Sequence, residues 1–110
     1  MGGTFEFEYV SGYPPLINDI NLENKIRNII QKNFGIENFI QVEQPSLGGE
    51  DFAIFAREVP SVFMFLGCRP KEIEIKEFPA IHNPKFNPDE DALKVGVEVF
   101  SNIVYDVLRE

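Results

Sequence analysis

The chain has 110 residues, enough for one small domain, and its 44% hydrophobic content indicates a packed chain rather than a disordered one. Its formal net charge of −8, without a basic cluster, argues against binding to nucleic acid or to an anionic membrane surface. No apolar run reaches the roughly 18 residues of a membrane-spanning helix, and the N-terminus lacks the basic and apolar regions of a signal peptide. The one cysteine excludes an internal disulfide, so we expect a cytoplasmic protein.

The first elements in chain order are a strand and a helix. Residues 4–10 alternate between aromatic and acidic side chains, which predicts a strand with one solvated face. Residues 11–15 contain two adjacent prolines and form an extended connector. A helix is expected over about residues 21–33, ended by Gly35. Its candidate caps are Asn18, Asp19 and Asn21, and its apolar positions are Leu22, Ile26, Ile29, Ile30 and Phe34.

The middle of the chain predicts two further strands around a short helix. Residues 39–42 read as a short strand, and a helix follows that runs to about Val59 before Pro60. The expected buried stripe of this helix is Phe52, Phe55, Ala56 and Val59. Residues 62–66 (Val-Phe-Met-Phe-Leu) are apolar on both faces, which predicts a central strand covered on both sides.

The last third combines a polar segment, a proline-rich loop and the longest helix. Ile73 and Ile75 are candidates for an edge strand, and the final helix is expected from Pro88 to about residue 108. Asn87 is a candidate N-cap for it, with Glu90 in the capping-box position. Gly96, on its apolar face, indicates close approach to another backbone.

This alternation of strands and helices predicts an α/β class with a short, mostly parallel sheet flanked by helices. A central strand needs neighbours on both edges, and two or three short strands cannot supply them. The amphipathic helices would also leave apolar faces uncovered. Hence the chain either forms oligomers or is one part of a larger fold.

Two places could carry chemistry. His82, the only histidine, lies in a proline-braced loop ahead of the last helix, which suits a metal ligand or an acid–base group, although a lone loop histidine is more often an ordinary hydrogen-bonding residue. Gly48, Gly49, Glu50 and Asp51 lie at a helix entrance, where backbone N–H groups could bind an anionic ligand, although the two acidic residues could simply cap the helix. A metal centre needs three or four ligands, so this chain alone is not expected to build one. Cys68 is read as a small apolar residue.

The two motifs together carry a family resemblance. Residues 46–53 (Ser-Leu-Gly-Gly-Glu-Asp-Phe-Ala), followed by residues 81–86 (Ile-His-Asn-Pro-Lys-Phe) and 89–93 (Asp-Glu-Asp-Ala-Leu), strongly resemble the carboxy-terminal part of the metal-dependent amidohydrolases and aminoacylases. That metallopeptidase family contains hippurate hydrolase, N-acetyl-diaminopimelate deacetylase and the auxin-conjugate hydrolases. Residues 12–19 resemble the segment where its chain leaves a smaller lid domain.

The resemblance implies a zinc-peptidase-like three-layer catalytic domain and hydrolysis of N-acyl amino acids or peptides by a metal-activated water. The metals would be two divalent ions, zinc or manganese, and His82 would be one of their ligands. The Gly48–Asp51 turn would help to shape the substrate pocket. On this interpretation residues 1–15 are a remnant of the lid domain with its crossing segment, and residues 16–110 belong to the catalytic domain.

The family's other metal ligands and its general base come from an amino-terminal part that this sequence lacks. We therefore expect the chain alone to be inactive and to bind no metal. It would be either a fragment of such an enzyme or the product of a divided gene that once worked with, or still needs, an amino-terminal partner. The alternative is a stand-alone homo-oligomeric interaction domain that kept the scaffold without catalysis. A third reading, a small protein that binds metal through His82 between subunits, has little support.

Overall fold

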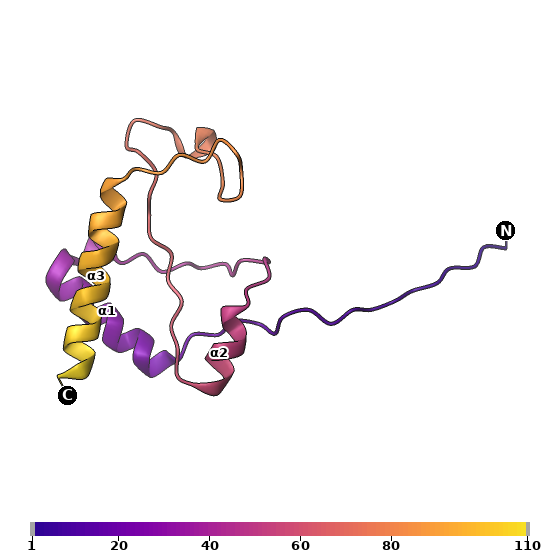
Figure 1. Ribbon diagram of the computed structural model, residues 1–110, viewed down its shortest axis with the longest axis horizontal. Coiled ribbons are helices and arrows are strands. Elements are labelled where there is room, and N and C mark those ends of the chain that lie inside the picture. Colours follow the sequence, from indigo (N-terminus) through magenta and orange to yellow (C-terminus); the bar gives the residue numbers. More distant parts are fainter. Residues whose placement is uncertain (1, 110) are drawn as a thin grey trace.

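The computed structural model describes residues 2–109, and these residues form helices joined by long irregular segments (Figure 1). The elements are α1 (Ile20–Phe34), the 3-10 turn η1 (Ile36–Asn38), α2 (Phe52–Glu58), the 3-10 turn η2 (Ile75–Glu77) and α3 (Asp91–Leu108). Helices α1 and α3 cross and contact each other, whereas α2 lies apart from both. The segment before α1 extends far from the body as an arm.

The predicted α/β class is wrong for the described residues, because none of them forms a strand or a sheet. Residues 4–10 leave Phe5, Phe7 and Tyr9 at least 78% exposed, so the alternating pattern has no neighbouring chain to pair with. The expected lid-domain strand is therefore absent. Residues 39–42 and 62–66 likewise have no ladder partner.

The predicted edge strand near Ile73 and Ile75 is replaced by turns. The Ile73 N–H donates to Pro70 O at 3.1 Å, and Ile75 begins η2. The Arg69 guanidinium donates to the carbonyls of Pro70 and Ile73, which closes this turn with local bonds and leaves no row of backbone groups for a ladder.

Helix α1 confirms its prediction. Asp19 is the N-cap: its carboxylate accepts from the Leu22 N–H at 2.8 Å. Gly35, with φ of 96°, ends the helix, and its N–H donates to Gln31 O at 3.1 Å. Local hydrogen bonds of this kind depend on neighbouring residues alone, so the sequence predicts them well.

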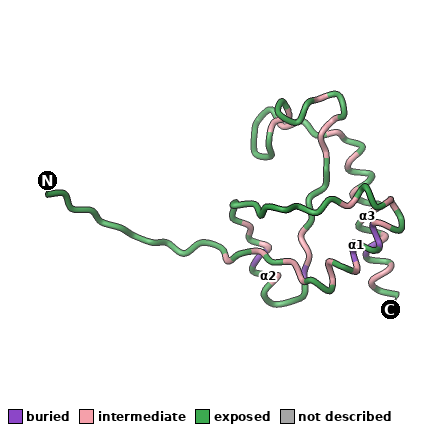
Figure 2. The backbone as a smooth tube through the Cα atoms, turned by 180° about the vertical axis from the view of Figure 1, so that it is seen from behind, coloured by how far each residue is buried: buried purple, intermediate pink, exposed green. Residues whose placement is uncertain are grey.

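The main core lies between α1 and α3, where Ile26, Ile29, Ile30 and Ile103 are buried. Half-buried side chains surround it from the helices and the connecting segments: Leu22, Phe34, Phe39, Val62, Val99 and Val107. Figure 2 shows how little of the rest of the chain is buried. The core thus joins two helices and leaves most apolar side chains outside.

The predicted buried stripe of α2 is wrong in half of its members. Ala53 is the buried residue of this helix at 1% exposure, whereas Phe55 and Val59 are 65% and 57% exposed. Phe52 and Ala56 are half-buried. A helix of two turns that contacts no other helix has one narrow covered face, and the periodicity predicted a wider one.

Helix α3 starts later than predicted. Asn87 is not its cap: Asp89 instead accepts from the Asp91 N–H through its carboxylate (3.0 Å) and from the Ala92 N–H through its carbonyl (3.1 Å). Gly96 approaches a side chain and not a backbone, because a Cβ added there would meet Leu66 Cδ2 at 2.9 Å.

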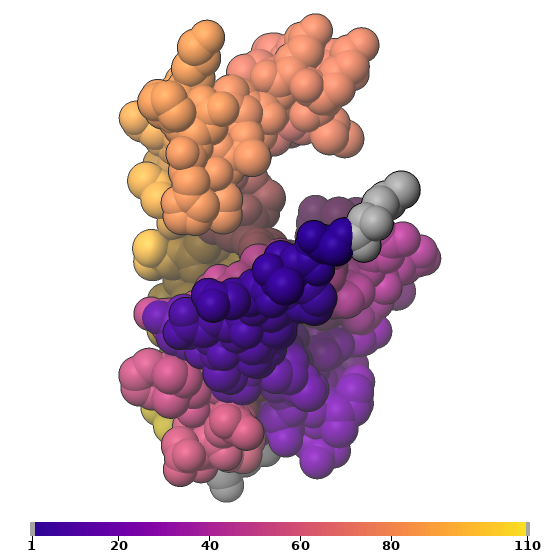
Figure 3. Space-filling model, turned by 90° about the vertical axis from the view of Figure 1, so that its right-hand side faces the viewer, coloured from indigo at the N-terminus to yellow at the C-terminus, as the bar shows by residue number. Residues whose placement is uncertain are grey.

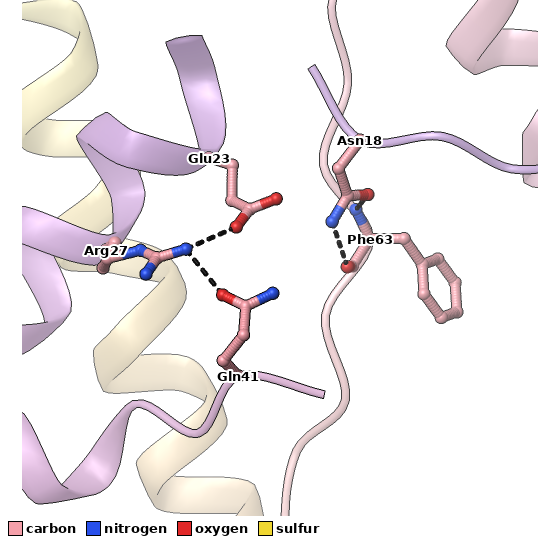
Figure 4. A network of polar contacts seen from close by, with 5 residues as sticks. All are labelled: Asn18, Glu23, Arg27, Gln41 and Phe63. Atoms are coloured by element: carbon pink, nitrogen blue, oxygen red, sulfur yellow. Dashed lines mark hydrogen bonds and ion pairs between the residues drawn. The ribbon is translucent and has the colours of Figure 1, made fainter. Parts of the chain in front are cut away.

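A polar network ties the segment after η1 to helix α1. Arg27 Nη2 lies 2.7 Å from Glu23 Oε1 and donates to Gln41 Oε1 at 2.6 Å (Figure 4). Its guanidinium also lies 4.8 Å from the centroid of the Phe39 ring. Because Arg27 bridges helix and segment, residues 39–41 stay against α1 without a ladder.

The molecule exposes far more surface than its mass requires. The radius of gyration is 18.5 Å, against about 13 Å for a compact domain of about 100 residues. The accessible surface is 9980 Å², against about 6,200 Å² for a folded monomer of this mass. Figure 3 shows the cause: the region of residues 70–90 stands apart from the body, with an open hollow between them. This excess surface agrees with the expectation of incomplete cover.

None of the described helices has the length and apolar character to cross a lipid bilayer.

We predict that Ile103→Ala lowers the free energy of unfolding by about 2–4 kcal/mol, because Ile103 is 7% exposed and joins α3 to α1. Val97→Ala, on the same helix but 69% exposed, should change it by less than about 0.5 kcal/mol. Urea unfolding followed by helical circular dichroism measures both. Equal effects would show that α1 and α3 do not pack as described.

Candidate functional site

The His82 loop is built by short-range contacts. The Asn83 N–H donates to Ala80 O at 3.1 Å and the Phe86 N–H to Asn83 O at 2.9 Å, so two tight turns follow one another. The Asn83 side chain accepts from the Lys85 N–H at 2.9 Å, a bond that favours such turns. The Phe86 ring packs 5.4 Å from that of Phe78 and closes the base of the loop.

One hydrogen bond anchors the loop to the body. The Asp89 N–H donates to Cys68 O at 2.8 Å, where the extended segment of residues 62–66 has just ended. The Asp89 carboxylate also accepts the Asp91 N–H at the start of α3. The Cys68 side chain is half-buried, and its interpretation as a small apolar residue stays a prediction.

His82 has a strained backbone and an exposed side chain. Its φ of 69° makes it the only non-glycine residue with positive φ among residues 2–109. That region costs a side-chain-bearing residue about 1 kcal/mol or more, so the turns around it must hold it there. The exposed imidazole makes no hydrogen bond to any described residue. An exposed imidazole on a constrained backbone can act as a metal ligand or as an acid–base group.

The second candidate, the turn of residues 48–51, leads into α2. Gly48 and Gly49 are exposed, and the Gly48 N–H donates to Ser46 Oγ at 3.2 Å. The Glu50 carboxylate accepts from the Phe52 N–H, the first of the helix, at 3.0 Å, a contact of the kind that the capping alternative expects. Asp51 makes no side-chain cap bond and is exposed.

The chain does not join these two candidates into one site. No hydrogen bond, ion pair or ring contact among the described residues connects His82 with residues 48–51. No group of three or more His, Cys, Asp or Glu side chains placed to hold a metal occurs in residues 2–109. The residues described here therefore do not by themselves fit a metal centre.

Two open hollows lie elsewhere on the surface. One, of about 480 Å³, is lined by Leu66, Leu93, Gly96, Val97, Phe100 and Ser101. The other, of about 310 Å³, is lined by Pro14, Pro15, Ile17, Ala53, Ala56 and Arg57. Neither is lined by His82 or by residues 48–51, so neither hollow joins the two candidates.

Sequence reasoning missed the role of Asn18, which it treated only as a possible cap. The Asn18 side-chain amide bonds both backbone groups of Phe63, with the Phe63 N–H donating at 2.8 Å and Asn18 Nδ2 donating at 3.2 Å (Figure 4). The available signal was the position of Asn18 directly before the N-cap Asp19. Because Asp19 caps the helix, the Asn18 side chain can bond a distant segment.

Comparison with known proteins gives the class of this scaffold. IAA-amino acid hydrolase ILR1-like 4 of Arabidopsis thaliana is 31% identical over 98 residues, 89% of this chain and 22% of the relative. N-acetyldiaminopimelate deacetylase of Streptococcus sanguinis (strain SK36) is 33% identical over 87 residues, 79% of this chain and 21% of the relative. YhaA of Bacillus subtilis (strain 168), provisionally named an amidohydrolase, is 31% identical over 100 residues, which are 91% of this chain and 24% of the relative. No solved structure matches the chain significantly.

A family model and the extent of these matches place the chain. The sequence model of peptidase family M20/M25/M40 matches residues 3–106, nearly the whole chain. The chain belongs to this family, as the resemblance predicted. It spans only about a fifth to a quarter of the length of the relatives that it matches.

We predict that the free energy of unfolding of the His82→Gly variant is about 1 kcal/mol higher than that of the His82→Ala variant, because glycine adopts positive φ without strain. Lys85, in the same loop, has no positive φ, so Lys85→Gly should be no more stable than Lys85→Ala. Urea unfolding of the four variants tests the difference. If alanine were at least as good as glycine at position 82, the loop would not hold the conformation described.

Proposed function

We propose that this chain is one part of a metal-dependent amidohydrolase that acts on N-acyl amino acids or peptides and is inactive alone. The observation that carries the proposal is the family match over residues 3–106 in a chain that covers a fifth to a quarter of its relatives. The names of those relatives describe hydrolysis of amide-linked amino acids. The missing catalytic groups would come from an amino-terminal polypeptide of the same family.

His82 would be this chain's single ligand to a pair of divalent ions, zinc or manganese, which would supply an activated water for amide hydrolysis. Its constrained backbone and exposed imidazole support this role, because the backbone position is held by turns while the side chain stays accessible to a metal. Residues 2–109 contain no group of three or more potential ligands, so the proposal takes the remaining donors from the amino-terminal polypeptide. That the chain alone binds no metal stays a prediction.

The turn of residues 48–51 would form part of the wall of the substrate pocket. Gly48 and Gly49 are exposed, so a ligand could approach the backbone closely there. The Glu50 carboxylate already accepts the Phe52 N–H, which leaves Asp51 as the acidic group free to face substrate or partner. We expect the cytoplasm as the compartment, since the one cysteine makes no internal disulfide.

The alternative, a homo-oligomeric interaction domain without catalysis, has one observation in its favour. The accessible surface of 9980 Å² includes many exposed apolar side chains, and self-association would cover some of them. A stable oligomer of the chain alone, without bound metal, would support this reading.

A chimera tests the main proposal. In it, this chain replaces the 87 matching residues of the Streptococcus sanguinis deacetylase. We expect the chimera to hydrolyse N-acetyldiaminopimelate and to hold metal, whereas the isolated chain does neither. His82→Ala in the chimera should lower activity and metal affinity by at least about 100-fold, since it removes a ligand.

Lys85→Ala in the chimera is the matched control, because Lys85 is an exposed neighbour in the same loop and is assigned no role in the site. It should keep activity and metal content. A folded chimera with His82→Ala that retained both would contradict the assignment of His82. Hydrolysis by the isolated chain at the rate of an intact relative would contradict the proposed dependence on a partner.

A further inference from the structure

The turn of residues 48–51 has few bonds that could hold it in place. Its hydrogen bonds stay within residues 46–54, where for example the Asp51 carbonyl accepts from the Ile54 N–H at 3.0 Å. Among residues 2–109, no hydrogen bond or ion pair joins the turn to a segment outside α2. Helix α2 itself contacts no other helix. The place of the turn therefore depends on packing against irregular segments.

The segment before α1 supplies such packing. Cδ2 of the Tyr13 ring lies 3.6 Å from the point that a Cβ on Gly49 would occupy, so the ring lies beside the bare backbone of the turn. Figure 1 shows the same segment passing α2 on its way to α1. Both line one hollow of about 310 Å³, to which the segment contributes Pro14, Pro15 and Ile17, and α2 contributes Ala53, Ala56 and Arg57.

Two exposures indicate that this packing is real cover. Ala53 is 1% exposed although α2 contacts no other helix, so irregular segments must cover it. Tyr13 is 58% exposed, whereas Phe7 and Tyr9 in the arm before it are each 78% exposed. The Tyr13 ring thus loses surface that the aromatic rings of the arm keep.

The segment that carries Tyr13 is stiff and is fixed at its other end. Pro14 and Pro15 follow Tyr13 directly, and each proline ring locks its own φ. Further along, the Asn18 amide makes two hydrogen bonds to the backbone of Phe63. The Asp19 N–H donates to Ser61 O at 2.8 Å. These bonds therefore limit where the Tyr13 ring can lie.

We propose that Tyr13 is a positioning residue for the turn of residues 48–51: its ring packs against Gly49 and keeps the turn in one place beside α2. The hydroxyl of Tyr13 has no hydrogen-bond partner among residues 2–109, so the ring carries the role. The packing contact is independent of the proposed function. Its consequence, tighter substrate binding by a fixed pocket wall, rests on that function.

Nuclear magnetic resonance on the isolated full chain tests the packing. Backbone order parameters of Gly49 and Glu50 should be about 0.8 in the unaltered chain and fall below about 0.6 in Tyr13→Ala, because the turn loses its support. Tyr13→Phe keeps the ring and should restore the order. Tyr9→Ala is the matched control, because Tyr9 is exposed in the arm.

Three results of this experiment overturn the proposal. Tyr13→Ala leaves the turn as ordered as before; Tyr9→Ala disorders it equally; or Tyr13→Phe fails to restore it. Helical circular dichroism checks that each variant folds. If Tyr13→Ala does not fold, a nuclear Overhauser effect between the Tyr13 ring and the Gly49 Hα in the unaltered chain decides: its presence supports the packing, and its absence overturns it.

The chimera with the Streptococcus sanguinis deacetylase tests the consequence for substrate. Tyr13→Ala should raise KM for N-acetyldiaminopimelate at least about fivefold and change kcat less than about twofold, because the turn would bind substrate and take no part in the chemical step. Tyr13→Phe and Tyr9→Ala should leave both constants within about twofold. The metal content should stay unchanged in all three variants, since His82 is intact.

The two experiments separate this inference from the proposed function. If the unaltered chimera hydrolyses nothing, the proposed function fails, and the order of the turn in the isolated chain still decides the role of Tyr13. If the chimera is active and Tyr13→Ala disorders the turn without raising KM, the role of Tyr13 in substrate binding is overturned while the function stands.

Discussion

The hydrogen bonds from Asn18 and Asp19 to residues 61–63 are the contact on which the arrangement of the chain depends. Asp19 caps α1 with its carboxylate and binds Ser61 O with its N–H, so one residue fixes both the start of the helix and the position of a segment more than forty residues later. The Asn18 amide adds two bonds to Phe63. Without them the extended segment would have only side-chain packing to hold it, since it belongs to no ladder.

The uncovered apolar surface follows from the size of the covered core. Four isoleucines between α1 and α3 are buried, whereas phenylalanines on α2, on α3 and in the arm stay exposed. Burial contributes roughly 25 cal/mol per Å², so an excess of thousands of Å² represents stabilisation that this chain cannot reach alone. The hydrophobic content that indicated a packed chain therefore does not become a packed core in these residues, and apolar side chains of residues 64–66 and α3 stay exposed.

Local elements could be predicted from the sequence and long-range ones could not. The cap at Asp19 and the stop at Gly35 depend on residues within four positions, and both were found in the predicted region. Residues 62–66 show the limit: the pattern predicted a central strand covered on both sides, but Met64, Phe65 and Leu66 are exposed, and no described residue provides the neighbour that a strand needs. At α3 the predicted start at Asn87 and Pro88 was wrong: the helix begins at Asp91, whose N–H is accepted by the Asp89 carboxylate, and the Asp89 N–H donates to Cys68 O.

The same distinction applies to the candidate site. The sequence predicted that His82 would lie in a constrained loop, because prolines and asparagine act locally, and its φ of 69° shows how strongly the turns constrain it. A complete set of metal ligands could not be predicted from one histidine, because metal ligands converge from distant parts of a fold. One contact links residues 62–66 with the His82 loop. Residues 62–66 lead directly to Cys68, whose carbonyl accepts the Asp89 N–H at the end of the His82 loop. The segment of residues 62–66 and the base of the His82 loop are therefore joined by this hydrogen bond, which places the loop relative to the rest of the chain.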